Sequence, residues 1–326
     1  MFATSAKDIL KPFKSDIATF QDYFKKSMKS NLRIVDEVAK YLVRHKGKQL
    51  RPMMVIVSAR TLSEPSEGSY LAAVVVELLH TATLVHDDVV DDAEIRRGFP
   101  TINKIWRNKI SILMGDYLLA KSLIIATEIG NLELMNIIAN VAKSMSKGEL
   151  LQIQKSRKLN ITEEEYFQLI KDKTASLISA CCELGAMTTN ANDGQREALK
   201  NFGLNLGVAF QIKDDLLDYQ SNSGILGKPT AHDLKDKKIT LPLLYAFQKS
   251  SLSDRKQVIH QLKNGVKRKE ITQIIDFIKT HDGINRAEQK AEYFKNQAIS
   301  HLNFLPDTKA RNVLTDLAEF VVKRTK

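Results

Sequence analysis

The chain has 326 residues, of which 43% are hydrophobic, with only 14 Gly and 7 Pro and a formal net charge of +11. Few helix-breaking residues leave long segments of good helix formers, so the composition favours an all-α fold with a sizeable core. The positive charge favours anionic partners, but dispersed lysines and a single Trp exclude a recognisable nucleic-acid-binding module. The adjacent Cys181 and Cys182 offer neither a disulfide framework nor metal-ligand spacing, which predicts a reducing, cytoplasmic location.

Apolar residues at helical spacing predict helices within residues 15–44, after the Gly47 and Pro52 interruption, and over residues 70–94. Further helices are expected at 110–129, 131–156, 161–189, 193–220 and from 239 onwards, with a capping box of Thr162 and Glu165 at one start. The stretch 221–238 is rich in loop formers and predicts a mobile lid. No repeat or compositional break divides the chain, no signal-peptide core is visible, and no apolar run approaches about 20 residues, so we expect one soluble domain.

Two acidic clusters share one spacing, in "LVHDDVVDD" (Asp87, Asp88, Asp91) and in "FQIKDDLLDY" (Asp214, Asp215, Asp218). On a helix, the three carboxylates of each cluster point to one arc of the surface. An exposed acidic face would be balanced by basic residues one turn away, but the positions three and four residues before each cluster carry none. Crowded carboxylates raise one another's pKa unless a cation neutralises them, and oxygen ligands suit Mg²⁺. The clusters therefore predict magnesium binding.

Basic residues near turns supply the complementary charge. They are Arg96 and Arg97 in "RRGFPT", Lys48 and Arg51 in "GKQLRP", Lys173 beside Thr174 in "KDKTAS", and Lys228 and Lys238 around the lid. Guanidinium groups grip phosphate oxygens bidentately. Each residue alone would be interpreted as a solvated surface group, but together with the aspartates they predict a site for two diphosphates. One diphosphate would be bridged through Mg²⁺ and the other held by cations alone.

These motifs, in this order from Lys48 to Pro242, resemble the trans-isoprenyl diphosphate synthase family, and most of all its long-chain polyprenyl members. The resemblance implies an isoprenoid synthase-type bundle of about a dozen helices around a central apolar cavity. It also implies a single polyprenyl synthetase domain over residues 1–326 and a homodimer.

The resemblance assigns roles by position. The six aspartates would be metal ligands for Mg²⁺, with about three ions per site, and would be catalytic together with Lys173 and Arg96. Residues expected to contact the allylic diphosphate are Arg96, Lys173, Thr174, Gln211, Lys228 and Lys238. Those expected to bind isopentenyl diphosphate are Lys48, Arg51, His80 and Arg97.

The resulting expectation is a Mg-dependent all-trans polyprenyl diphosphate synthase that condenses isopentenyl diphosphate head-to-tail onto an allylic diphosphate such as farnesyl diphosphate. Ala82 and Thr83 lie one turn beneath Asp87, and such small side chains favour a deep pocket for a heptaprenyl to octaprenyl product, as in quinone side chains. Larger residues would form the floor, with candidates Met114, Met135 and Met145. Product release would involve a transient membrane contact.

Several alternatives remain from the sequence. They are a short-chain geranylgeranyl or farnesyl diphosphate synthase, a regulatory subunit of a heteromeric synthase, a terpene cyclase, and a basic helical interaction protein. The intact "DDLLD" argues against the cyclase and the regulatory subunit. The chain departs from the family at Ala231 and Lys237, where Gly is usual and its loss would stiffen the lid, at Gln49, and in the extra Asp92.

Overall fold

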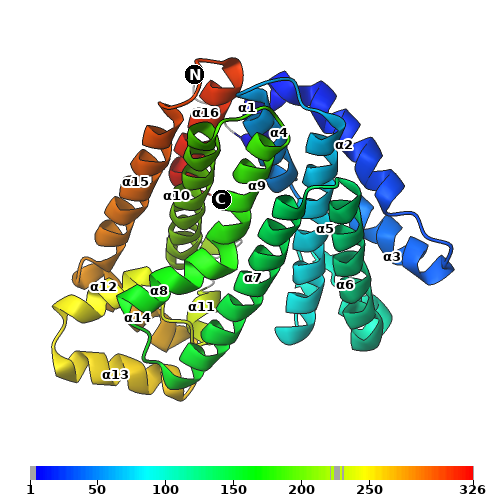
Figure 1. Cartoon of the computed structure of the whole chain (residues 1–326). Coiled ribbons are helices and arrows are strands. Elements are labelled where there is room, and N and C mark those ends of the chain that lie inside the picture. The colour runs from blue at the N-terminus through cyan, green and yellow to red at the C-terminus, as the bar shows by residue number, and fades with distance from the viewer. Residues whose placement is uncertain (1–4, 221, 224–227, 230, 326) are drawn as a thin grey trace. The chain divides into compact units, whose positions relative to one another are not determined.

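A computed structural model describes residues 5–220, 222–223, 228–229 and 231–325, and confirms the all-α expectation (Figure 1). Helices in the described residues outnumber the dozen implied by the resemblance, because short pieces such as α1 (Ala6–Ile9) and α11 (His232–Lys235) are set off from the long ones. The long helices are α2 (Lys14–Ser27), α3 (Arg33–Arg44), α4 (Leu50–Arg60), α5 (Glu67–Val90), α6 (Ile102–Glu128), α7 (Leu132–Lys158), α9 (Ser176–Met187), α10 (Asp193–Gln220), α12 (Leu241–Lys249), α13 (Leu252–Lys263), α14 (Arg268–Thr280), α15 (Gly283–Leu302) and α16 (Lys309–Lys323).

Contacts group the chain into two compact units, each built from separate stretches of sequence. Unit 1 comprises residues 1–142, 180–200 and 304–316, and unit 2 comprises residues 143–179, 201–303 and 317–326. Two short antiparallel pairs are the strands of the described part, β1 (Ile95–Arg96) with β2 (Phe99–Pro100) in unit 1, and β3 (Asn222–Ser223) with β4 (Lys228–Pro229) in unit 2.

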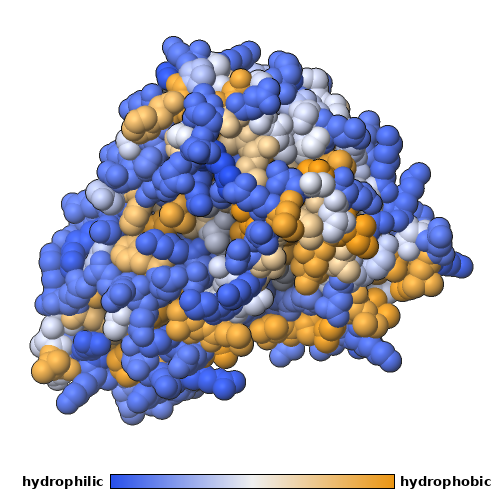
Figure 2. All heavy atoms as spheres, in the orientation of Figure 1, coloured by the Kyte–Doolittle hydropathy of each residue, from blue (hydrophilic) through white to orange (hydrophobic). Residues whose placement is uncertain are grey.

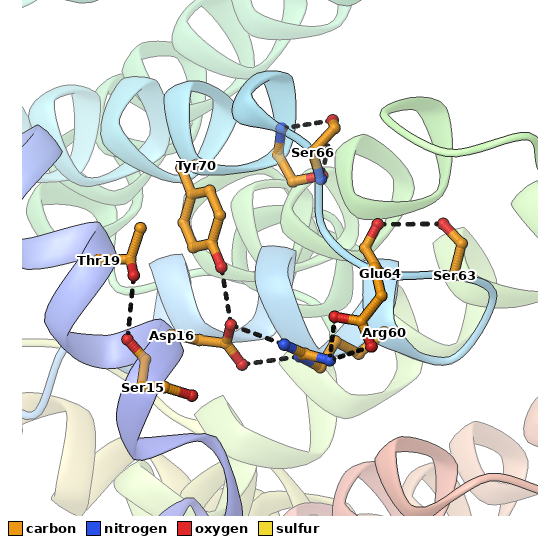
Figure 3. Close-up of polar contacts among 9 residues, drawn as sticks. Ser15, Asp16, Thr19, Arg60, Ser63, Glu64, Ser66 and Tyr70 are labelled. Atoms are coloured by element: carbon orange, nitrogen blue, oxygen red, sulfur yellow. Dashed lines mark hydrogen bonds and ion pairs between the residues drawn. The ribbon is translucent and has the colours of Figure 1, made fainter.

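The first helices of unit 1 are tied together by a buried carboxylate (Figure 3). Asp16 on α2 accepts two hydrogen bonds from the Arg60 guanidinium on α4, at 2.7 and 3.0 Å, and one from the Tyr70 hydroxyl on α5, at 2.7 Å. Arg60 also contacts Glu64, so its charge is matched on both sides. A buried carboxylate that accepts three hydrogen bonds holds its helices together, because removing the Arg60 guanidinium would leave its charge unpaired.

Helix α5 begins with a capping box between Ser66 and Ser69 and buries most of its length against α4 and α6. It ends at Val90, four residues before the predicted end, because the Ala93 N–H bonds to the Asp88 carbonyl and Asp92 takes a left-handed conformation. Helix α6 is kinked at Arg107, whose φ is 70°.

Within the described residues, two helices are long and apolar enough to cross a bilayer by length and composition, which the sequence analysis did not expect. In α5 the most apolar window is 61% buried, as in a core helix, whereas in α6 it is only 39% buried. Helix α6 therefore carries apolar surface that this chain leaves uncovered in the described residues.

The predicted helix over residues 161–189 is three consecutive elements. They are α8 (Glu163–Ile170), the π-helical turn η2 (Lys171–Ala175) and α9. The expected capping box starts α8, since the Thr162 hydroxyl accepts from the Glu165 N–H and the Glu165 carboxylate accepts from the Thr162 N–H. A π-turn inside a helix commonly marks a functional site, and this one contains Lys173 and Thr174.

Candidate active site

The first acidic cluster lies where α5 ends. Asp88 is only 6% exposed, and its Oδ1 accepts a hydrogen bond from Arg96 Nε at 2.7 Å. Burial raises the pKa of Asp88, while the Arg96 guanidinium acts to lower it. Asp87 is half-buried and Asp91 is exposed at the C-cap. Since the helix C-terminus is the negative end of the helix dipole, three carboxylates there favour a bound cation.

The turn after this cluster is held by residues that the sequence analysis missed. Asn103 Nδ2 donates to the backbone carbonyls of Asp88 and Ala93, at 3.2 and 3.0 Å, and the Thr101 hydroxyl donates to Ala93 at 2.7 Å. These bonds fix the path of the chain from Asp91 to Arg96. Neither residue carries a charge, and both bond to backbone atoms, so no sequence motif identifies them as part of the site.

A cationic cluster of unit 1 surrounds the middle of α5. Arg51 Nη1 lies 3.0 Å from His80 Nε2, and because guanidinium only donates, the imidazole accepts. Burial and then the positive charge of Arg51 lower the pKa of His80 well below its usual value, so the ring is neutral. The Arg97 guanidinium packs against Gly47, where any Cβ would collide with it. Lys48 is exposed.

Glu77, which the sequence analysis did not single out, lies buried among these cations. Burial raises its pKa to about 7, although Arg51, Arg97 and Lys46 act in the opposite direction. Glu77 is therefore only partly ionised near neutral pH, so it offsets little of the positive charge around it. This region can hold an anion without a metal, as the predicted cation-only diphosphate site requires.

The second acidic cluster occupies the last turns of α10, and each of its carboxylates has a protein partner. Asp214 Oδ1 accepts from Arg324 Nη2 at 2.6 Å. Asp215 accepts from the Tyr166 hydroxyl at 2.6 Å and from Gln211 Nε2 at 2.9 Å. Burial, followed by repulsion from Asp233, raises the pKa of Asp215 well above the usual carboxyl range.

A hydrogen-bonded network links this cluster to the π-turn. The Thr174 hydroxyl donates to Gln211 Oε1 at 2.8 Å, so Thr174, Gln211, Asp215 and Tyr166 form one continuous chain of bonds. Gly207 permits this approach of α10 to η2, because a Cβ there would collide with Ala175. The network lines a cavity of about 160 Å³ that also receives the side chains of Lys173, Asp233 and Lys238.

Lys173 points to two partners within unit 2. Its ammonium pairs with the Glu149 carboxylate and donates to Gln152 Oε1 at 3.1 Å. Lys238 bonds to Asp236 at 3.0 Å. Both cations therefore lie at the cavity, but with acidic neighbours that a substrate diphosphate would have to replace.

The described part of the lid is fastened by Asp218. Its two oxygens accept the backbone N–H groups of His232 and Asp233, at 3.0 and 2.9 Å, at the start of α11. Ala231 and Lys237 have φ of 40° and 58°, so the positions where the family usually has Gly are left-handed here. Lys228 falls in β4, but its side chain lies outside the described residues.

The C-terminal Arg324 is a further residue that the sequence left without a role. Besides the bond to Asp214, its guanidinium donates to the Phe210 carbonyl at 3.2 Å and lies over the Phe210 ring, 4.2 Å from the centroid. Its side chain is only 12% exposed. These contacts hold the end of α16 against α10 beside the second cluster.

The candidate pocket residues lie on or near α5 as expected. Ala82 is buried, and the Thr83 hydroxyl donates to the His80 carbonyl at 2.8 Å. Among the floor candidates, Met114 is buried, whereas Met135 and Met145 are half-buried. The central cavity and its floor stay predictions.

The aspartates fit Mg²⁺ by their chemistry, since both clusters offer carboxylate oxygens at helix C-termini. Across the described residues, no three His, Cys, Asp or Glu side chains converge as a metal-binding group. Mg²⁺ is usually held by one or two carboxylates together with waters and substrate phosphates. The geometry therefore fits binding completed by a diphosphate rather than a closed protein cage.

Comparison with known proteins agrees with this chemistry. The family model described as "Polyprenyl synthetase" matches residues 32–278. Octaprenyl diphosphate synthase of Escherichia coli is 31% identical over 95% of this chain and 96% of its own length. Heptaprenyl diphosphate synthase component 2 of Geobacillus stearothermophilus is 35% identical, again over 95% and 96%. The crystal structure of a decaprenyl diphosphate synthase from Rhodobacter capsulatus is similar with a TM-score of 0.93 and 35% identity, covering 99% of this chain and 100% of that one.

Proposed function

Because the chain belongs to the polyprenyl synthetase family and is a prenyltransferase, we propose that it is an all-trans, long-chain polyprenyl diphosphate synthase. Its substrates would be isopentenyl diphosphate and an allylic diphosphate such as farnesyl diphosphate. The observation that carries this proposal is the pairing of each acidic cluster with cations, Asp88 with Arg96 in unit 1, and Asp214 with Arg324 in unit 2. Such surroundings suit a diphosphate that arrives with Mg²⁺.

In the proposed reaction, cationic side chains stabilise the charge that develops as the allylic C–O bond breaks. Arg96, Lys173, Thr174, Gln211, Lys228 and Lys238 would hold the allylic diphosphate. Mg²⁺, when bound by the aspartates of the two clusters, would supply further charge neutralisation of the leaving diphosphate. The isopentenyl double bond then attacks the allylic carbon, and the proton that is lost passes to the released diphosphate.

The isopentenyl diphosphate would be held by Lys48, Arg51, His80 and Arg97 without metal. The Arg51–His80 contact supports this role. The neutral His80 ring accepts a hydrogen bond that orients the guanidinium, and it does not neutralise the positive charge of Arg51. Closing of the lid would exclude water, which would otherwise capture the allylic cation.

Product length is proposed from the wall of α5. Ala82 is buried one turn beneath Asp87, and so small a side chain leaves depth for a heptaprenyl to octaprenyl chain. The test is incubation of the purified protein with Mg²⁺, labelled isopentenyl diphosphate and farnesyl diphosphate, with the products resolved by length. A ladder ending at seven or eight units supports the proposal, a stop at four units, one beyond the primer, replaces it with the short-chain alternative, and no incorporation with any allylic primer rejects it.

A substitution on the same helix isolates the role of Ala82. Ala82→Phe would fill the wall beneath the aspartates and is expected to shorten the product, while Ala82→Ser keeps a small side chain and should leave the ladder unchanged. An unaltered ladder in the Phe variant, with normal folding, would move the length-determining residues elsewhere.

The quaternary structure is proposed from α6. Its exposed apolar side chains include Ile112, Leu113 and Ile124, a surface that suits a second copy in a homodimer. Light scattering of the purified chain gives the mass, and Leu113→Lys should shift it from dimer to monomer. One relative is named as component 2 of a synthase, and full activity of the purified chain alone would argue against a second component here.

The cellular location is proposed from the cysteines. Cys181 and Cys182 are free and buried, as expected in a reducing cytoplasm.

A further inference from the structure

Unit 1 contains a groove of about 790 Å³ away from both acidic clusters. It lies along the last turn of α2, the connecting residues 28–31 and one face of α3, with Leu32 next to it in the chain, and is called the α2–α3 groove below. None of the residues with a proposed role in prenyl transfer lines it.

The rim of the α2–α3 groove is strongly basic. Four exposed cations line it, namely Lys25, Lys29, Lys40 and Arg44, and none of them has an ion-pair partner among the residues that the structure describes. The single carboxylate in the lining, Asp36, already accepts the Ser30 N–H at 3.0 Å. Unbalanced like charges at one groove favour an anion there.

The electrostatics of a neighbouring residue agree with this excess of charge. The pKa of Lys46 is lowered, first by burial and then by the positive charge of Lys25. An anion in the groove would relieve this repulsion.

The floor of the same groove is apolar. Met28 and Ala39 are buried beneath it, Val43 is half-buried, and Leu32 is 59% exposed in the connecting segment. At the position of α3 in Figure 1, Figure 2 shows hydrophilic and hydrophobic surface next to each other. A free phosphate needs no apolar floor, whereas a phospholipid presents an anionic headgroup directly above apolar chains. The combination therefore favours a lipid over a soluble anion.

The two walls of the groove are fixed in place. Helix α2 is held by the Asp16–Arg60 pair (Figure 3). Helix α3 is held by Tyr41, whose hydroxyl donates to the Pro100 carbonyl at 2.6 Å and whose ring packs edge-on against Trp106. Because its walls are already ordered, the groove would lose little conformational entropy when a ligand binds.

We propose that the α2–α3 groove is a membrane-docking site that takes the phosphate headgroup of an anionic phospholipid between its four cations, with Leu32 entering the interface. The docking itself is independent of prenyl transfer, but its purpose rests on the proposed function, because a long polyprenyl diphosphate is an amphiphile that partitions into lipid. The site would thus bring the chain to the surface that receives its product.

The test is co-sedimentation of the full-length protein with vesicles of phosphatidylcholine, and of phosphatidylcholine mixed with phosphatidylglycerol. The wild type should bind the anionic vesicles and not the neutral ones. Each cation near an anionic surface contributes about 1 kcal/mol, or roughly fivefold, so Lys29→Gln with Lys40→Gln should weaken vesicle binding about 30-fold. Leu32→Ser should weaken binding further through the lost apolar contact.

A matched control separates the groove from net charge. Lys256 on α13 and Lys269 on α14 are also exposed, and neutralising both gives the same net charge as the groove variant. This control should bind vesicles like the wild type. Equal losses in both double variants, equal binding of the wild type to neutral vesicles, or its failure to bind anionic ones would each overturn the proposal.

Two further outcomes are informative. Displacement of the wild type from anionic vesicles by low concentrations of inorganic phosphate, at constant ionic strength, would show a free-phosphate site instead of a lipid site and would also overturn it. Prenyl transfer by the groove variant in vesicle-free solution should equal that of the wild type. Since vesicle binding requires no substrate, a chain without prenyltransferase activity would still report on the groove.

Discussion

Asp88 and Asp215 hold the same place in two clusters of identical spacing, but one carboxylate meets a guanidinium and the other a phenol and an amide. In the first cluster, Asp91 stays exposed at the helix end, whereas in the second all three carboxylates accept hydrogen bonds from protein groups. We therefore propose that the exposed Asp91 of the first cluster acts as a ligand alone, whereas the second cluster is also a structural junction of α10, α8, α11 and the C-terminus. Identical spacing in the sequence therefore does not give the two clusters the same structural role.

The largest expected effect tests whether Asp91 of the first cluster acts as a Mg²⁺ ligand without a structural role. Asp91→Asn should lower kcat about a thousandfold, because it removes a carboxylate charge needed to hold Mg²⁺ against the leaving diphosphate, and it should leave stability unchanged. Isopentenyl diphosphate incorporation and thermal unfolding measure the two effects. The adjacent exposed carboxylate provides the control, since Asp92→Asn should retain activity. Equal losses in both variants would mean that general surface charge, not ligation, is at work.

The next effect concerns Glu77, a buried acid among the cationic residues of unit 1, in contrast to the exposed Asp91. The pKa of Glu77 is raised by burial from 4.5 to about 7, so its protonated form favours the folded state. This stabilisation is fully present below pH 4.5 and is lost as the pH rises through about 7. Between pH 4.5 and pH 8, the wild type should lose about 3 kcal/mol of unfolding free energy more than Glu77→Gln.

Urea unfolding of both proteins across this range gives the difference. If the unfolding free energies of the two proteins changed in parallel with pH, the charges of Arg51, Arg97 and Lys46 would already offset the burial of Glu77, and its pKa would not be raised.

A smaller effect tests the second cluster as a junction. Asp218→Ala removes the acceptor for the His232 and Asp233 N–H groups and should cost about 1 to 2 kcal/mol of stability as well as activity. Asp218→Asn keeps a capping oxygen but not the charge, so it should keep the stability and lose the activity. Chemical unfolding with parallel assays separates the two roles. If the Asn variant were as unstable as the Ala variant, the capping account would be wrong.

The smallest effect concerns the lid beside that junction. Ala231 is left-handed, so Ala231→Gly should raise the unfolding free energy by about 0.5 kcal/mol after the greater entropy of Gly in the unfolded chain is counted. Ala246→Gly in the interior of α12 should instead lower it by about 1 kcal/mol. A destabilised Ala231→Gly variant would show that the left-handed turn is not strained.

Much of this organisation could be predicted from the sequence, because helix periodicity and capping are local. The helices, the Thr162 capping box and both clusters were found in this way. The partners of the clusters could not be found, since Tyr166 and Arg324 lie far from Asp215 and Asp214 along the chain and carry no motif of their own. The early end of α5 was missed because left-handed Asp92 has no Gly to mark it.

The interleaving of the two units affects how the chain is made. Unit 1 includes residues 304–316 and unit 2 includes residues 317–326, so neither unit is complete before these segments have been synthesised. The N-terminal helices of unit 1 are therefore synthesised long before residues 304–316, which belong to the same unit. Deletion of residues 304–326 would therefore remove part of both units at once.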